Sequence, residues 1–328
     1  MINFFKKLSP LNILGLAVVL LVLRAGYLFN LPAKIDAAYS APFERLLLST
    51  NLHYSLAPPL NVFIAGVLVF IQALLLNRLV NHFNLLGKPT FLPALMYITV
   101  SGLYTPFLVL SPPLICNFFV IWMLYKLINF YKAKDSRSTT FDLGMIVALG
   151  SLIYLPFIFF FLTIWVALII FKPFNWREWM ACIIGYTTIF FFLAVYYYLG
   201  DTLPRFGHIW QPLETKFPAR VVISYYNYFL LAPVALILIL CFISLRQNYY
   251  KSYIQVRKTF QLLLLMFTVA ALTFYVKAAF QLSHFLLCAV PAAIFFAYYF
   301  LHARRGWFYE TLYVLMAAAI VYLQFNTF

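Results

Sequence analysis

Residues 58–80 read PPLNVFIAGVLVFIQALLLNRLV, an apolar run whose one charged residue, Arg78, lies close to its end. A helix needs about 20 mostly apolar residues to cross the hydrocarbon core of a bilayer, and this run is long enough. Over the whole chain 65% of the residues are hydrophobic and 9% are charged, whereas about one quarter are charged in ordinary soluble domains. The run therefore predicts a membrane-spanning helix in an all-α integral membrane protein.

Similar apolar runs recur along the chain and predict about 11 transmembrane helices in a single membrane domain, residues 1–328. No run shows the alternation of apolar and polar residues at period two that marks a membrane barrel, which favours helices. The spans are expected near residues 9–29, 58–80, 89–109, 113–131, 141–154, 156–171, 179–199, 229–245, 259–276, 283–301 and 308–326.

The Lys and Arg residues between these runs alternate, being numerous in one connection and scarce in the next. With Lys6 and Lys7 in the cytoplasm, the connections on that side hold sixteen of the 23 Lys and Arg residues, in agreement with the positive-inside rule. This pattern predicts a cytoplasmic N-terminus and an outside C-terminus in a multi-pass protein of a bacterial inner membrane. The net charge of +15 is then an orientation signal that also attracts anionic lipids, and no nucleic acid partner is expected.

The first of two long outer connections, residues 30–57, contains candidate catalytic residues. A Pro at the start and apolar residues at helical spacing predict a short amphipathic helix at 42–48 that lies on the membrane. Asp36 and Glu44 are candidates for a catalytic carboxylate beside this helix, and Arg45 is a candidate substrate-binding residue. The alternative is that both acids are solvated loop residues, with Glu44 favoured by the positive end of the helix.

The second long outer connection, residues 200–228, contains the other candidate substrate-binding residues. These are Asp201, Arg205, His208 and Arg220. Arg binds phosphate through a forked pair of hydrogen bonds, so its presence on a side that is otherwise poor in positive charge indicates a phosphate site. The alternative is a solvated loop from which Arg220 reaches the lipid headgroups.

Arg24 and Asp142 are charged residues inside expected spans. Arg24 lies near the outer end of the first span, where its long side chain is expected to reach the headgroups, although a charge inside a membrane is also a candidate for function. Asp142 lies at the inner end of the fifth span and is expected to face water or to pair with a neighbour such as Lys126.

Two groups of uncharged polar residues also fall within the expected spans. The cysteines form no Cys-x-x-Cys pair, so they are expected to act as small buried apolar residues rather than as disulfides or metal ligands. They are Cys116, Cys182, Cys241 and Cys288. The second group either lines a path through the membrane or bonds to neighbouring helices. It consists of Gln72, Asn117, Thr187 and Thr188.

Roughly residues 1–200 resemble the C-type membrane glycosyltransferases, which have the GT-C fold. The features that match are, in order, Asp36, the short helix at 42–48 and the Pro-started run at 58–80. The stretch LPFIFFFLTIWVALIIFKPFNWREW, residues 155–179, is similar to the sixth-span region of that family. The chain departs from the family in lacking an adjacent pair of acids in the first outer loop and a large outer domain at the C-terminus.

The resemblance implies an enzyme that transfers a sugar from a polyprenyl-phosphate donor at the outer face of the membrane. Asp36 would accept the proton of the acceptor hydroxyl, and Arg205 or Arg220 would bind the departing lipid phosphate. Membrane lipids and a polyprenyl-phosphate sugar are therefore the expected partners. No cofactor is expected, and no residue pattern supports a divalent metal, although one is compatible with this chemistry.

Other functions are open on the same sequence. The chain also resembles a bacterial polytopic membrane family sometimes labelled carotene oxygenase, but its five His residues lack the i, i+3 or i, i+4 spacing of a metal site. A transporter or flippase for lipids or small molecules is a second alternative. A noncatalytic subunit of a membrane complex is a third, and it would have a membrane protein partner.

Overall fold

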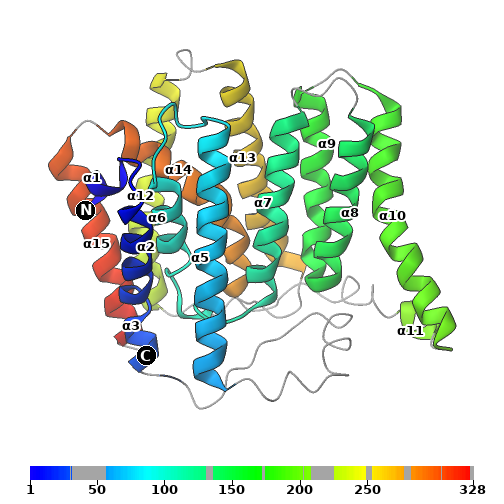
Figure 1. Cartoon of the computed structure of the whole chain (residues 1–328), viewed down its shortest axis with the longest axis horizontal. Helices are drawn as coiled ribbons and strands as arrows, with labels where there is room; N and C mark the ends of the chain where they lie inside the picture. The colour runs from blue at the N-terminus through cyan, green and yellow to red at the C-terminus, as the bar shows by residue number, and fades with distance from the viewer. Residues whose placement is uncertain are drawn as a thin grey trace.

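The computed structural model describes residues 1–29, 31, 57–130, 136–171, 174–201, 203–207, 225–248, 253–276, 282–303 and 305–325. Within these residues every regular element is a helix, and the long helices stand side by side in one bundle (Figure 1). In chain order the helices are α1 Ile2–Phe5, α2 Leu11–Val22, α3 Ala25–Phe29, α5 Pro58–His82, α6 Leu92–Val100, η1 Thr105–Phe107, α7 Pro112–Phe130, α8 Arg137–Ile153, η2 Leu155–Phe159, α9 Phe160–Phe171, α10 Trp176–Leu199, α11 Pro204–Gly207, α12 Tyr225–Asn248, α13 Ile254–Leu272, η5 Thr273–Val276, η6 Leu282–Cys288, α14 Ala289–His302 and α15 Gly306–Phe325.

Six helical segments in the described part of the chain are long and apolar enough to cross a membrane. They are α5, α7, α10, α13, α15 and the continuous segment made by η6 and α14. The predicted all-α character is therefore confirmed for the described residues, and these six segments agree with the predicted multi-pass membrane protein. The other expected spans correspond to shorter or broken helices, such as α2 followed by α3 and the nine-residue α6 followed by η1.

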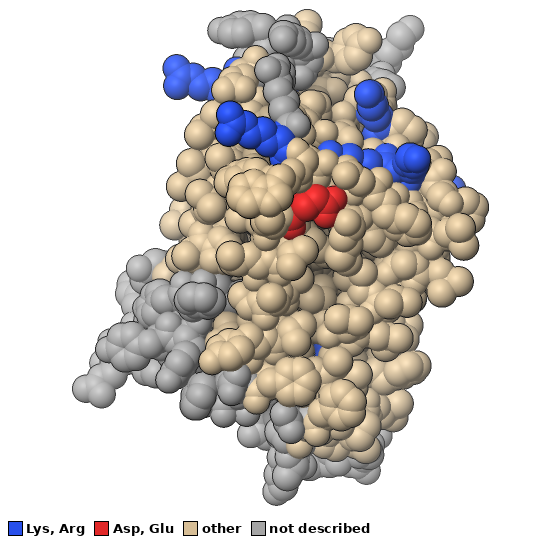
Figure 2. Space-filling view, turned by 90° about the vertical axis from the view of Figure 1, so that its left-hand side faces the viewer, with Lys and Arg blue, Asp and Glu red and all other residues tan. Residues whose placement is uncertain are grey.

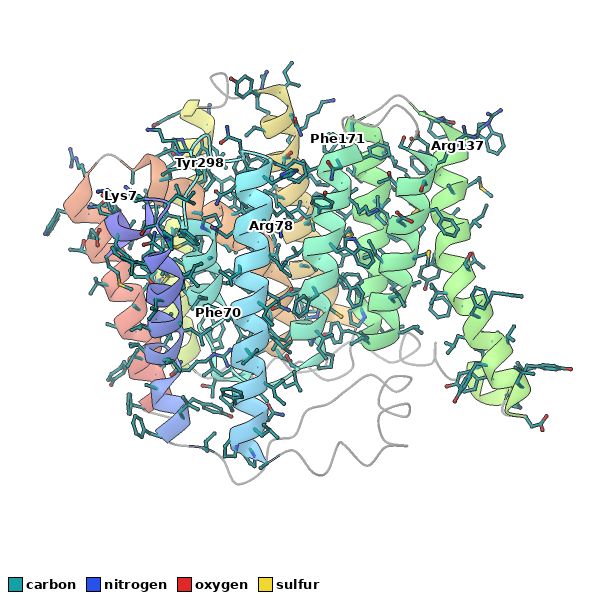
Figure 3. The ribbon with its side chains drawn as sticks, in the orientation of Figure 1. Lys7, Phe70, Arg78, Arg137, Phe171 and Tyr298 are labelled. Atoms are coloured by element: carbon teal, nitrogen blue, oxygen red, sulfur yellow. The ribbon has the colours of Figure 1, made fainter. Side chains whose placement is uncertain are left out.

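The helix ends that carry most of the described Lys and Arg residues lie together at one end of the bundle, which we call the basic end. Lys7, Arg78 and Arg137 lie toward this end in Figure 3. On the face shown in Figure 2, the Lys and Arg side chains likewise gather toward one end. Lys126 of α7 lies 2.7 Å from a carboxylate oxygen of Asp142 on α8, which confirms the predicted pairing of Asp142.

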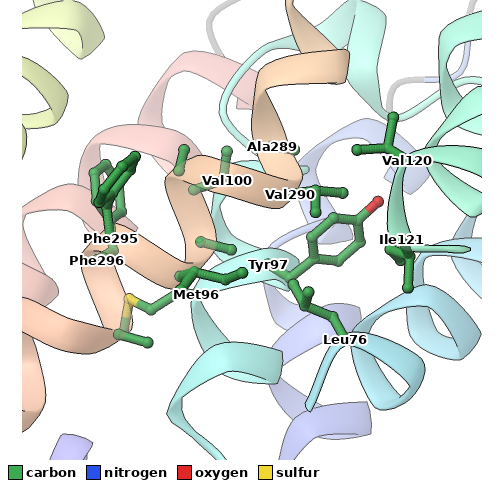
Figure 4. Close-up of a cluster of buried hydrophobic side chains, with 14 of the residues drawn as sticks. Leu76, Met96, Tyr97, Val100, Val120, Ile121, Ala289, Val290, Phe295 and Phe296 are labelled. Carbon is green, nitrogen blue, oxygen red and sulfur yellow. The ribbon is translucent and has the colours of Figure 1, made fainter. Parts of the chain in front are cut away.

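The two central helices, α6 and α14, pack against each other and are enclosed by the rest of the bundle. Every residue of α6 is buried, as is every residue of α14 up to Phe300. Figure 4 shows their contact, where Met96 and Tyr97 of α6 lie close to Val290 and Phe296 of α14. Apart from Leu301 and His302 at the end of α14, the side chains of both helices are covered by neighbouring helices.

Helices α8 and α10 pack at unusually short range because each has a glycine at the crossing. A Cβ atom on Gly144 would lie 2.1 Å from the carbonyl oxygen of Cys182, and one on Gly185 would lie 2.1 Å from that of Phe141. Small residues allow such close backbone approach in membranes, where dispersion contacts between helices replace the hydrophobic effect. This pair fixes the side of the bundle on which α10 lies.

In the described part of the chain, four short 3₁₀ segments interrupt the helices at the end of the bundle opposite the basic end. A proline is the second residue of both η1 and η2. Its ring disfavours continuation of the preceding helix. η6 contacts η1, and η2 contacts η5, so these irregular segments meet one another. Irregular backbone inside a membrane is tolerated where it is buried in protein or lines a cavity, so this region is a candidate for a functional site.

Candidate functional site

Most residues predicted from the two outer loops lie outside the described part of the chain. These are Asp36, Glu44, Arg45, His208 and Arg220, together with the amphipathic helix expected at 42–48. Of the remaining two, Arg205 belongs to the short helix α11, and Asp201 lies between α10 and α11. Figure 1 places α11 at the opposite side of the bundle from α3.

Asp201 has a structural role in ending helix α10. Its φ is 50°, in the left-handed region that Asp and Asn adopt more readily than most residues. Its backbone N–H donates a hydrogen bond to the carbonyl of Tyr198 in the last turn of the helix. The side chain itself is exposed. This geometry explains why Asp stands at the position without giving its carboxylate a bound partner.

Arg24 is the charged residue that the structure places inside the bundle. It occupies the turn between α2 and α3, and its side chain is 4% exposed. Its Nη1 donates hydrogen bonds to the carbonyl oxygens of Val62 at 3.3 Å and Leu108 at 3.0 Å. The preferred interpretation from sequence, a side chain reaching the headgroups, was therefore wrong, because α5 and the residue after η1 enclose the guanidinium.

Arg24 also lines an apolar groove between α2, α3 and α5, which we call the Arg24 groove. The groove has a volume of about 250 Å³, and its walls include Leu20 and Leu28 on one side and Phe63 and Phe70 on the other. Phe63 is 66% exposed at its edge, so the groove opens on the outer surface of the bundle. An isolated buried cation thus lies against a groove whose walls suit an acyl or polyprenyl chain.

The guanidinium of Arg24 is incompletely satisfied. Its Nη2 is buried and has no hydrogen-bond partner among the residues that the structure describes. A buried charged donor left unpaired costs more free energy than an exposed one, because the low local dielectric does not solvate it. Because Nη2 has almost no accessible surface, an anion in the Arg24 groove would reach it only after the lining side chains move.

A second set of buried polar residues crosses the centre of the bundle. Gln72 of α5 donates to the carbonyl of Leu114 at 2.7 Å, and the hydroxyl of Tyr97 donates to Oε1 of Gln72 at 2.7 Å. Asn117 of α7 donates to that same hydroxyl at 3.1 Å and to the carbonyl of Leu286 in η6 at 3.0 Å. Figure 4 shows the Tyr97 hydroxyl on the side of the ring toward Val120 and Ile121.

A histidine in η6 extends this set of buried polar residues to the start of η2. Nδ1 of His284 lies 2.7 Å from the hydroxyl of Tyr154, and Nε2 lies 2.9 Å from the carbonyl oxygen of Ala270. A carbonyl only accepts, so Nε2 carries the hydrogen in the neutral ring and Nδ1 accepts from Tyr154. We call Gln72, Tyr97, Asn117, His284 and Tyr154 the buried polar chain.

The buried polar chain joins the irregular segments to the straight helices. Polar residues are costly in a membrane interior, so they are satisfied by neighbours and mark either helix–helix contacts or a path for substrate or protons. Gln72 and Asn117 bond to neighbouring segments, as one of the two sequence interpretations predicted. Thr187 and Thr188 instead donate to carbonyls within α10 and are exposed, so they take no part in the chain.

No group of three or more His, Cys, Asp or Glu residues in the described segments is arranged to hold a metal ion. The four cysteines are buried free thiols, as predicted. The chemistry of this region is therefore that of one buried guanidinium, two amides, two phenols and an imidazole.

Sequence reasoning identified Gln72, Asn117 and Arg24 as polar residues within spans but did not bring them together. Tyr154 and His284 could have been found from the local sequence, because each interrupts an apolar run. Tyr154 lies two residues before Pro156, and His284 lies within η6. Proline and polar residues that interrupt a membrane span point to a binding site more often than uninterrupted runs do.

Comparison with known proteins gives one match. A protein-family sequence model described as "Family of unknown function (DUF6427)" matches residues 44–328, which is most of the chain. No curated protein and no solved structure matches it.

Proposed function

The chain belongs to the DUF6427 family, and from the geometry above we propose that it is a GT-C-like glycosyltransferase of the bacterial inner membrane. It transfers a sugar from a polyprenyl-phosphate donor at the face of the membrane opposite the basic end. The proposal combines the resemblance of residues 1–200 with the Arg24 groove, which provides both requirements of such a donor: an apolar surface for the lipid and a cation for its phosphate.

The proposed topology has about 11 spans, a cytoplasmic N-terminus and an outside C-terminus. Support comes from the gathering of the described Lys and Arg residues at the basic end, which the positive-inside rule assigns to the cytoplasm. The turn that holds Arg24 and the start of α5 then lie toward the outer face. The proposed topology assigns the connection that holds Asp36, residues 30–57, to the outer side as well.

Arg24 is the single observation that carries the proposal. Arg24 lies beside an apolar groove, and a lipid phosphate that entered the groove would supply the missing hydrogen bond once the lining side chains moved to expose Nη2. A charge-assisted bond from guanidinium to phosphate is among the stronger hydrogen bonds in proteins. Because negative charge on the phosphate grows as the sugar departs, the bond would stabilise the transition state more than the ground state.

The reaction proceeds by displacement at the anomeric carbon of the sugar. The acceptor hydroxyl oxygen forms a bond to this carbon, and the bond from the carbon to the phosphate oxygen breaks with its electron pair. Asp36 accepts the hydroxyl proton, and polyprenyl phosphate leaves as an anion bound by Arg24, with Arg220 as a further candidate. Arg205 belongs to α11, which lies at the opposite side of the bundle from the Arg24 groove (Figure 1), so it is not expected to bind the same phosphate. Glu44 is the second candidate for the base, and Arg45, Asp201 and His208 are candidates for binding the sugar or the acceptor.

Turnover by the full-length protein in vesicles tests the proposal. Vesicles would contain a radiolabelled polyprenyl-phosphate hexose, and release of polyprenyl phosphate would be measured. We expect Arg24→Gln to lower the rate by at least about tenfold, the loss of one bond to a charged group. Arg177→Gln removes the same charge from an exposed site on α10 and serves as the matched control. Equal rates for the two variants would contradict the role of Arg24, and full activity of Asp36→Asn would exclude Asp36 as the base.

A second candidate function is transport or flipping of a lipid, which the broken helices favour. Transporters place their sites at interrupted helices, and here η1 contacts η6 and η2 contacts η5 beside the buried polar chain, although toward one end of the bundle. In the same vesicles a flippase would move a fluorescent polyprenyl phosphate between leaflets without releasing product. Absence of both activities, with stable copurification of a membrane protein, would instead identify a noncatalytic subunit.

A further inference from the structure

A second groove lies between α5 and α7, in the half of the bundle toward the basic end. Its volume is about 520 Å³. Leu75, Arg78 and His82 contribute from α5, and Phe118, Trp122 and Tyr125 contribute from α7. Both sets recur at intervals of three or four residues, so each forms a stripe along one face of its helix. We call this space the Arg78 groove.

The Arg78 groove changes from apolar to polar along its length. Leu75 and Phe118 form one end, while His82 and Tyr125 lie seven residues further along their respective helices. Seven residues of α-helix span about 10 Å, which is comparable with the passage from the acyl region of a leaflet into its headgroups. Trp122 is 47% exposed at the polar half, where indole and phenol groups are commonly placed at membrane interfaces.

The charge of Arg78 in the groove is not neutralised within the described part of the chain. Arg78 and His82 are exposed, and neither side chain forms a hydrogen bond or ion pair with another described residue. The nearby cation Lys126 differs, because it already pairs with Asp142. Positive charge is therefore available in the groove at the headgroup level of the leaflet on the basic side.

We propose that the Arg78 groove binds one anionic phospholipid of the leaflet at the basic end of the bundle. Its phosphate lies against Arg78 and His82, and the first part of an acyl chain lies along Leu75 and Phe118. A lipid satisfies both ends of the groove, whereas a soluble anion would use only the charged end. This site is separate from the Arg24 groove, which lies further toward the other end of α5, and it does not depend on the proposed glycosyl transfer.

Lipid titration of the full-length protein in detergent, followed by native mass spectrometry, tests this site. The probes are phosphatidylglycerol and phosphatidylcholine with identical acyl chains. We expect the wild type to prefer phosphatidylglycerol and Arg78→Gln to lose about tenfold in affinity for it. Arg177→Gln, which removes an exposed Arg at the same end, should change that affinity by less than about twofold. Leu75→Trp retains Arg78 and His82 but fills the apolar end, and it should also weaken binding.

Three results would overturn the proposal. Equal affinity of the wild type for the two lipids would remove the role of charge. Equal losses in Arg78→Gln and Arg177→Gln would show attraction to the basic end as a whole rather than a site. Displacement of phosphatidylglycerol by millimolar inorganic phosphate would show that the groove takes a soluble anion. Size-exclusion profiles and melting temperatures equal to those of the wild type establish that each variant is folded.

Discussion

The hydroxyl oxygen of Tyr154 lies 2.7 Å from Nδ1 of His284, and this contact joins the start of η2 to η6 inside the bundle. Both residues stand where a helix is interrupted, so the contact ties together two segments that lack a complete set of helical hydrogen bonds. His284 is held from its other side by the carbonyl of Ala270 in α13. The imidazole thus fixes the relative position of three parts of the chain.

Replacing Tyr154 by Phe should lower the free energy of unfolding by about 1–3 kcal/mol, because Nδ1 of His284 would lose its buried donor. The phenyl ring is otherwise nearly isosteric, so packing changes little. The loss is measured by unfolding the purified protein in mixed detergent micelles. Tyr196→Phe removes the same hydroxyl from an exposed position on α10 and should have almost no effect. Similar losses for both variants would contradict a specific role for the contact.

Replacing Asn117 by Leu should also destabilise the bundle by about 1–3 kcal/mol, because the buried carbonyl of Leu286 and the hydroxyl of Tyr97 would each lose a donor. Thr187→Val is the control, since Thr187 donates only to the carbonyl of Ile183 within its own helix. We expect Thr187→Val to change stability by less than about 0.5 kcal/mol. If the two variants unfold alike, Asn117 does not connect α7 to η6 in the way that the distances indicate.

The long uninterrupted spans were predictable because their signal is local. In α5 and α7 the apolar run and its length lie within one stretch of sequence, and the helices follow it closely. The pairing of Lys126 with Asp142 was predictable for a similar reason. The two residues lie near the same end of consecutive spans, so a short connection returns one beside the other.

The breaks and the burial of Arg24 were not predictable in this way. Residues 89–109 are mostly apolar, so hydropathy alone shows one span where the structure has α6, a turn and η1. The burial of Arg24 depends on α5 and on Leu108, which is 84 residues away in the chain. A contact at that separation is set by how the helices pack, and no local pattern reports it. Of the candidate site residues, Asp201 is explained by its backbone conformation at the end of α10, while Asp36 and Glu44 lie outside the described segments.

Replacing Gly144 by Ala should separate α8 from α10 and lower the free energy of unfolding by about 1–3 kcal/mol, the usual cost of overpacking. The added Cβ would meet the backbone carbonyl oxygen of Cys182 at 2.1 Å, and backbone cannot move aside as a flexible side chain can. Gly102→Ala is the matched control, because its Cβ would meet no atom closer than 3.5 Å. Unfolding of both variants in the same micelles gives the comparison, and an equal loss would show that the crossing tolerates a methyl group.

Arg24 should respond to lipid phosphate in a way that separates its structural role from its proposed binding role. Replacing it by Met leaves the carbonyls of Val62 and Leu108 without their donor, so the variant should be less stable than the wild type even without ligand. A ligand that binds only the folded state raises stability by about 2.7 kcal/mol at one hundred times its dissociation constant. Polyprenyl phosphate should therefore raise the melting temperature of the wild type but not that of Arg24→Met. Arg24→Lys retains the charge without the forked geometry, so it should show an intermediate rise. An equal rise in all three proteins would mean that the buried guanidinium serves only to hold α5 and the residue after η1 against the turn between α2 and α3.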